Sequence, residues 1–178
     1  DHGGRVREGP QWQLVDRLGQ QRVDGSNAEF WEEICGSGWA RMLGITGTEP
    51  DALERFDNYF FAYYPYLARR YIDGFQIEGR RVLEIGLGYG TLGHYLASRG
   101  ADYHGFDIAS TPVAMMEHSL GVLNIPTRHR VAAVSAHAIP YPNHFFHFVY
   151  SIGCLHHPGH TSTGVAHSPT TLAPAAIP

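Results

Sequence analysis

The sequence predicts an α/β protein with a doubly wound, mainly parallel sheet. Short apolar segments alternate with helix-like segments in the second half of the chain. The first apolar segment, 81–85, leads into a turn with glycine at every second position over 86–90, and the second, 103–106, ends at Asp107. Strands that alternate with helices through short connections are typical of parallel sheets, which bind ligands at the carboxyl ends of their strands.

The first part of the chain is expected to be helical rather than part of the sheet. Residues 1–26 are polar and predict a flexible lead-in. Residues 27–79 predict a helical aromatic cap, with one helix capped by Asn27 and another starting near Pro50. Pro65 is expected to interrupt the second helix.

Aromatic residues are concentrated in this cap, with seven of them between Tyr59 and Tyr71. One interpretation is that they pack the cap onto the sheet. The other is that they form a lid over an active site, with aromatic walls for an apolar or planar substrate. The two interpretations are compatible, and the sequence leaves both open.

The strand and helix segments of the second half follow from apolar runs and helix signals. Thr111-Pro112 marks a helix start, and Gly100 marks a helix stop. The predicted strands are 81–85, 103–106, 130–134 and 146–151, and the predicted helices are 91–99 and 111–123.

Two domain boundaries complete the organisation. Residues 80–158 are assigned to a ligand-binding domain. Residues 159–178 are assigned to a low-complexity tail of His, Thr, Ser, Ala and Pro without periodicity. No Asp, Glu, Lys or Arg follows Arg130.

Composition excludes several classes of function. The net charge of -4 argues against a nucleic-acid partner, and the two cysteines are far apart, which disfavours zinc sites and disulfide frameworks. No apolar run is long enough to span a membrane, and no signal peptide is recognised. These features predict a soluble cytoplasmic protein without a metal site.

Two carboxylates frame the glycine turn and suggest its ligand. Glu84 stands at the end of a buried strand, where a carboxylate needs a partner, and a ligand amine or sulfonium would supply one. Asp107 ends the second strand, where a carboxylate can accept both hydroxyls of a ribose. A nicotinamide dinucleotide is the competing ligand. Its fingerprint requires glycine where Thr91 stands and does not include Glu84.

At this point the chain resembles the class I S-adenosylmethionine-dependent methyltransferases, and most closely the ubiquinone/menaquinone-type branch that acts on small molecules. Val82–Thr91 (VLEIGLGYGT) matches the first motif of that family, and Gly105–Ile108 (GFDI) matches its acidic strand end. Residues 138–157 match the family pattern around "LPFPDNSFDVVYSIGVLHH". The resemblance implies a Rossmann-like methyltransferase fold over residues 80 to about 158.

The resemblance also assigns roles around the cofactor S-adenosylmethionine. Gly86, Gly88 and Gly90 would let the backbone approach its methionine part, and Glu84 would lie near its amino group. Asp107 would bind the ribose. A strand-end acid satisfied by neighbouring backbone remains the alternative for Glu84, and a turn or helix-cap acid for Asp107.

Further positions are assigned to the adenine and to the far side of the methionine. Ile108 would pack on the adenine, Ser135 and Ala136 would line its edge, and Ser151 would close the methionine side. The family usually has Asp where Ser135 stands, so a charged acceptor for the adenine amine is missing here. The family's "FDVV" Asp is His147 in this chain.

The end of the sequence is shorter than the family pattern, which continues with about three more strands. The sheet is therefore expected to be incomplete, with an uncovered edge at the fourth strand through which two copies could pair.

The predicted reaction is methyl transfer from S-adenosylmethionine to an O, N or C nucleophile of a small molecule. No catalytic nucleophile is visible, and His156 or His157 is a candidate general base. Two alternatives stay open, a degenerate protein that binds the nucleoside without turnover and an NAD(P)-binding reductase.

Overall fold

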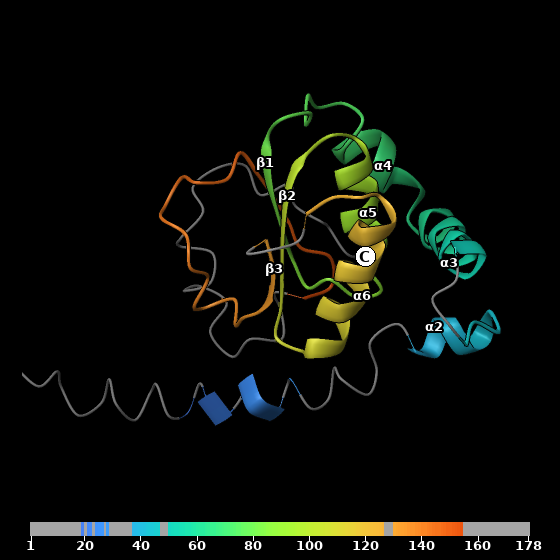
Figure 1. The fold of residues 1–178 in the computed structure, drawn as a ribbon, viewed down its shortest axis with the longest axis horizontal. Helices are drawn as coiled ribbons and strands as arrows, with labels where there is room; N and C mark the ends of the chain where they lie inside the picture. Colours follow the sequence, from blue (N-terminus) through green and yellow to red (C-terminus); the bar gives the residue numbers. More distant parts are fainter. Residues whose placement is uncertain are drawn as a thin grey trace, which may run out of the picture.

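A computed structural model describes residues 37–46, 50–126 and 130–154, together with several positions between 19 and 28. The helices, labelled as in Figure 1, are α2 (Ser37–Met42), α3 (Pro50–Tyr63), α4 (Pro65–Tyr71), α5 (Thr91–Ser98) and α6 (Ser110–Val122). The strands are β1 (Arg81–Ile85), β2 (Asp102–Asp107), β3 (Val131–Ala133) and β4 (Phe148–Tyr150). The helix predicted from Asn27 and the predicted tail at 159–178 lie outside the described residues.

The four strands form one parallel sheet in the order β3-β2-β1-β4. This arrangement confirms the predicted α/β class with a parallel, Rossmann-like sheet. The strand order reverses at β1, because β2 and β3 lie on one side of it and β4 lies on the other. The carboxyl end of β1 is therefore a topological switch point, the place where open parallel sheets bind ligands.

Helices cover one face of the sheet, as Figure 1 shows for α4, α5 and α6. Between this face and the helices lies a core that includes Val82, Leu96, Met116 and Leu120, all fully buried. The opposite face carries a second cluster, which includes Leu83, Ile85, Phe106, Phe146 and Val149. The connection from β3 to β4 covers this second face, and its described part, 134–147, contains no helix.

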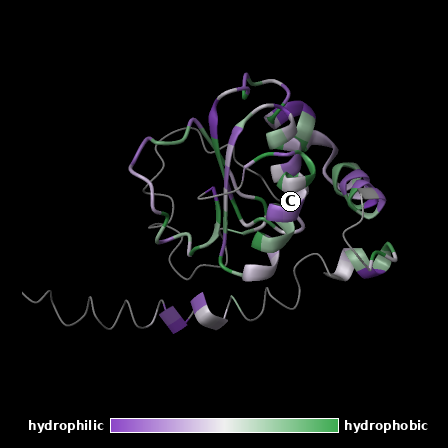
Figure 2. Cartoon of the chain, viewed as in Figure 1, coloured by the Kyte–Doolittle hydropathy of each residue, from purple (hydrophilic) through white to green (hydrophobic). Residues whose placement is uncertain are grey.

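The cap consists of α2, α3 and α4. The start of α3 at Pro50 was predicted, and Pro65, predicted only as an interruption, is itself the first residue of α4. Proline suits both places because its missing N–H is not needed in the first turn of a helix. Figure 2 shows hydrophilic and hydrophobic residues alternating around α3. Its buried side carries Ala52, Leu53 and Phe56.

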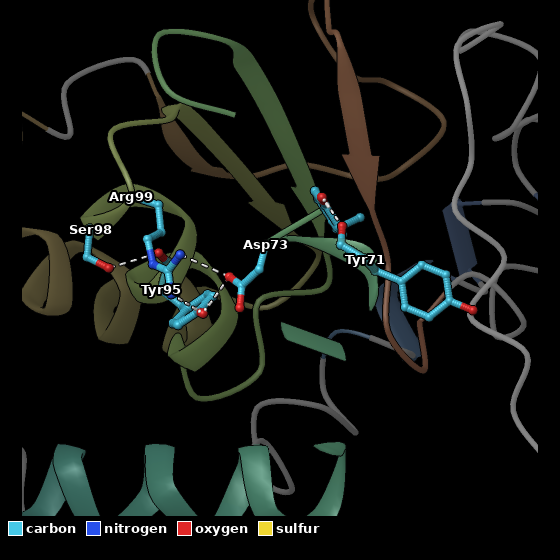
Figure 3. A network of polar contacts seen from close by, with 6 residues as sticks. Tyr71, Asp73, Tyr95, Ser98 and Arg99 are labelled. Carbon is cyan, nitrogen blue, oxygen red and sulfur yellow. Dashed lines mark hydrogen bonds and ion pairs between the residues drawn. The ribbon is translucent and has the colours of Figure 1, made fainter. Parts of the chain in front are cut away.

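Polar contacts attach the end of the cap to the sheet layer (Figure 3). The Tyr95 hydroxyl of α5 donates to Asp73 Oδ1 at 2.9 Å, and Arg99 Nη1 lies 2.9 Å from the same oxygen. From β4, the Tyr150 hydroxyl donates to the backbone oxygen of Tyr71 at 2.7 Å. These contacts connect the segment after α4 to α5 and β4, and thereby fix the cap next to the glycine turn.

Candidate ligand-binding site

The turn after β1 contains three glycines with left-handed backbone, at φ +84° for Gly86, +54° for Gly88 and +88° for Gly90. A Cβ on Gly86 would lie 2.5 Å from Cβ of Cys154, and one on Gly90 would lie 3.5 Å from Met116 Sδ. A Cβ on Gly88 would meet no atom within 4 Å. A Cβ on Gly86 would therefore overlap Cys154, one on Gly90 would make an ordinary contact, and one on Gly88 would reach open space, so the positive φ is the requirement that all three share.

Glu84 is buried at the end of β1, with 2% of its surface exposed. Its Oε2 accepts a hydrogen bond of 2.6 Å from the Tyr103 hydroxyl. Burial raises the pKa of Glu84 to about 8, although the Tyr103 hydrogen bond acts in the opposite direction. The carboxyl is thus mostly uncharged at pH 7, and its protein partner is a side-chain hydroxyl rather than the backbone considered in the sequence analysis.

Asp107 at the end of β2 is bonded to two segments of backbone. Its Oδ2 accepts from the N–H of Leu87 in the glycine turn at 2.7 Å, and its Oδ1 accepts from Ala109 N–H at 3.0 Å. Burial raises the pKa of Asp107 above its usual value, and these backbone hydrogen bonds oppose the shift. The carboxylate joins the glycine turn to the start of α6, a geometry that fits both a turn acid and a ribose acceptor.

A cavity of about 430 Å³ lies between the cap and the glycine turn. On the sheet side it is lined by Glu84, by the turn and by the first residues of α5. On the cap side it is lined mainly by aromatic residues. The lining residues are Gly38, Trp39, Phe56, Phe60, Tyr64, Glu84, Gly86, Leu87, Gly88, Tyr89, Thr91, Leu92 and Ile152.

The aromatic residues of the cap pack it onto the domain below and also line the cavity. Phe56 is buried and stacks on Tyr89 of the glycine turn, with ring centroids 4.0 Å apart, so it packs the cap onto the domain below. Phe60 and Tyr64 are half-buried and line the cavity. Trp39 also lines the cavity. The prediction missed it because it precedes the aromatic run in the sequence.

The residues predicted for the adenine lie beside Asp107, outside the cavity. The backbone N–H of Val134 donates to the Asp107 carbonyl oxygen at 2.7 Å, which places Ser135 and Ala136 just beyond it. Ile108 follows Asp107 directly and is half-buried. The predicted residues therefore form two groups. Glu84, Gly86 and Gly88 line the cavity, whereas Asp107, Ile108, Ser135 and Ala136 do not.

One predicted position directly follows β4, and two further ones are not described by the structure. Ser151 is half-buried, follows β4 directly and precedes Ile152 of the cavity wall. His156 and His157, the candidate general bases, lie outside the described residues.

Within the described ranges, no group of three or more His, Cys, Asp or Glu side chains could hold a metal ion. No helix in this part of the chain combines the length and hydrophobicity needed to cross a membrane.

Comparison with known proteins identifies a family and several solved structures with a similar fold. A family described as "Methyltransferase domain" matches residues 82–174. The fold is similar to that of magnesium protoporphyrin IX methyltransferase from Synechocystis, solved with bound S-adenosylhomocysteine. The TM-score is 0.51 and the identity is 19%, over 75% of this chain and 59% of that one. The cyclase SpnF is also similar, with a TM-score of 0.46 and 19% identity over 63% of this chain and 39% of SpnF. No curated protein matches the sequence.

Proposed function

The chain belongs to the methyltransferase domain family, and from this premise we propose that it transfers the methyl group of S-adenosylmethionine to a small molecule. The observation that carries the proposal is Glu84, a buried carboxyl in the wall of a cavity, directly before the glycine turn. Such a group is suited to a cationic ligand, because the ligand charge compensates the ionised carboxylate. The similar Synechocystis enzyme was solved with S-adenosylhomocysteine, the cofactor without its methyl group. This chain covers 59% of the length of that enzyme.

The residues present fit this cofactor at several points. A Cβ on Gly88 would meet no atom within 4 Å, and the half-buried Asp107 accepts from the N–H of Leu87 in the same turn. Thr91 Oγ1 is buried, belongs to a cavity-lining residue and has no hydrogen-bond partner among the described residues. An unpaired buried hydroxyl is costly unless a ligand pairs with it. This part of the chain therefore offers polar groups for the amino-acid part and for the ribose of such a cofactor.

In the proposed mechanism the protein contributes binding and alignment. The cofactor, when bound, supplies a sulfonium-activated methyl group. Glu84 would hold its ammonium group and Asp107 its ribose hydroxyls. Ile108, Ser135 and Ala136 would border the adenine, and Ser151 the methionine side. The cap would exclude water and hold the acceptor at the methyl group, which is how positioning accelerates a direct displacement.

The cavity wall also suggests the kind of acceptor. Its cap side is made by Trp39, Phe56, Phe60 and Tyr64. Among the described residues that line the cavity there is no Arg, Lys or His that could hold a phosphate or carboxylate. We therefore propose an uncharged, apolar or planar acceptor with an O, N or C nucleophile.

Calorimetric titration with S-adenosylhomocysteine tests the cofactor, with NADH as the comparison ligand. We expect binding of the first and not of the second. If S-adenosylhomocysteine does not bind at millimolar concentration, the proposal is wrong. If it binds but no acceptor in a panel of planar phenols, amines and quinols is methylated, the alternative of a binding protein without turnover is favoured.

A further inference from the structure

Two glycines inside regular elements leave room for one tyrosine. Gly93 lies within α5 and Gly105 within β2, where glycine weakens a helix or a strand. A Cβ on Gly93 would lie 2.4 Å from the Tyr103 hydroxyl oxygen, and a Cβ on Gly105 would lie 2.5 Å from it. Real Cβ atoms do not approach another atom so closely. Positions 93 and 105 must therefore both be glycine for the Tyr103 hydroxyl to lie where it does.

The strand register directs this hydroxyl to Glu84. Gly105 is the pairing partner of Glu84, and Tyr103 is the partner of Val82, so all four residues face the same side of the sheet. Tyr103 is 1% exposed, and its ring extends past Gly105. Its hydroxyl donates to Glu84 Oε2 at 2.6 Å. Burial and the neighbouring Glu84 raise the pKa of Tyr103 well above its ordinary value, so the hydroxyl remains a donor at every physiological pH.

We propose that Tyr103 is a positioning residue, whose hydroxyl in the slot between Gly93 and Gly105 orients the Glu84 carboxyl toward a ligand ammonium group. This inference rests on the proposed function. The bond engages one carboxylate oxygen, Oε2, of a residue that lines the cavity. A donated hydrogen bond also favours the ionised carboxylate, which is the form that attracts an ammonium group.

The test compares Tyr103→Phe with Tyr150→Phe as the matched control. Tyr150 is also buried and pairs with Glu84 in the sheet, but its hydroxyl donates to the backbone of Tyr71. The probes are S-adenosylhomocysteine, which carries the amino-acid group, and methylthioadenosine, which lacks it. We expect Tyr103→Phe to weaken S-adenosylhomocysteine binding at pH 7 about tenfold, which corresponds to a rise of about one unit in the pKa of Glu84. Methylthioadenosine binding should be unchanged. Tyr150→Phe removes a contact of the cap that both probes share, so it should leave the ratio of the two affinities unchanged.

The pH profile separates positioning from a general loss of structure. In the unmodified protein, the affinity for S-adenosylhomocysteine relative to methylthioadenosine should rise as pH approaches about 8, where Glu84 ionises. Because the Tyr103 hydrogen bond lowers the pKa of Glu84, its removal should move this rise to higher pH. In a Glu84→Gln background, Tyr103→Phe should have little further effect, since the two residues act through one contact.

Several results would overturn the inference. Equal weakening of both probes, an unchanged pH profile, or a full effect of Tyr103→Phe in the Glu84→Gln background would each contradict it. If Tyr103→Phe does not fold, Gly105→Ala is the second variant, because its Cβ overlaps the Tyr103 hydroxyl, although that Cβ also lies 2.8 Å from Leu87. It should weaken S-adenosylhomocysteine binding more than methylthioadenosine binding, and an equal loss for both probes would refute the inference. Failure of both nucleosides to bind the unmodified protein would instead reject the proposed function.

Discussion

At the scale of single residues, the three glycines of the turn share one backbone requirement but have different surroundings. Gly86, Gly88 and Gly90 all have positive φ, so each favours glycine for its backbone alone. Their surroundings differ, because Gly86 lies against Cys154 and Gly88 faces open space. The sequence shows the shared conformational need but cannot show which neighbour occupies the space where a Cβ would be.

Alanine substitutions should separate these requirements. Gly88→Ala should cost about 1–2 kcal/mol of unfolding free energy, the price of left-handed backbone for alanine. Gly86→Ala should cost roughly 3 kcal/mol or more, because its Cβ also overlaps Cys154. Urea denaturation measures both values. Gly88→Ala should in addition weaken S-adenosylhomocysteine binding, and an equal loss of stability in the two variants would contradict this account.

The candidate site was predictable where its residues lie in sequence next to a strand end. Glu84 and Asp107 follow from the rule that parallel strands present their carboxyl ends to ligands, and their proposed ligand contacts remain predictions. Tyr103 did not follow from that rule, because its bond to Glu84 depends on the register of β1 and β2. Gly93 and Gly105 were the available signal, since glycine inside a helix or strand indicates a close neighbour.

At the scale of elements, α3 has two functions along its length. Phe56 is part of a buried cluster with Ala40, Ile45 and Ala52, which holds α2 and α3 together. Phe60, one turn further along, is half-buried and lines the cavity. The helix therefore connects the packing of the cap to the shape of the proposed acceptor site.

Substitutions in the cap should test the acceptor class. Phe60→Ala should weaken binding of 2-naphthol, a flat neutral probe, in the presence of S-adenosylhomocysteine, because it removes one aromatic wall. Tyr66→Ala is the control, since Tyr66 is 40% exposed and does not line the cavity. Decahydro-2-naphthol, which is similar in size but not flat, should bind more weakly than 2-naphthol. Equal binding of the two probes, or equal effects of the two variants, would refute a planar acceptor.

Element boundaries were predictable where local chemistry sets them. β1 has the predicted bounds, and the helix starts at Pro50 and Pro65 follow from the chemistry of proline. β3 and β4 are shorter than predicted, because each pairs with its neighbour over only three residues. Beyond those pairs, Val134 still donates to the Asp107 carbonyl oxygen, whereas Phe146 only packs on the face of the sheet. A hydrophobic pattern alone cannot distinguish these two cases.

At the scale of the whole molecule, two buried titratable groups make stability depend on pH in opposite directions. Glu84 has a pKa raised from 4.5 to about 8, so its contribution is greatest at low pH and is lost as pH rises toward 8. Burial lowers the pKa of His104 below 6.5, against the opposing effect of Asp102. The contribution of His104 is therefore present above pH 6.5 and is lost as pH falls.

The two effects oppose each other below pH 6.5, and only that of Glu84 acts above it. We expect the Tm of the ligand-free protein to fall by roughly 4 °C between pH 6.5 and pH 8. Glu84→Gln should remove this fall, whereas Glu117→Gln, a change of an exposed acid on α6, should retain it. Scanning calorimetry across this range is the measurement. A pH-dependent fall that persists in Glu84→Gln would show that another group is responsible.

The slot around the Tyr103 hydroxyl also constrains how this sequence can vary. Positions 93, 103 and 105 behave as one unit, because a Cβ at either glycine would overlap the tyrosine hydroxyl. Alanine at 93 or 105 is then compatible only with a shorter side chain at 103, and a related chain should change these positions together. In other sequences, a glycine within the helix and a glycine within the strand, together with the strand tyrosine, can therefore be used as a pattern. The pattern should indicate a tyrosine that holds a buried glutamate in the same way.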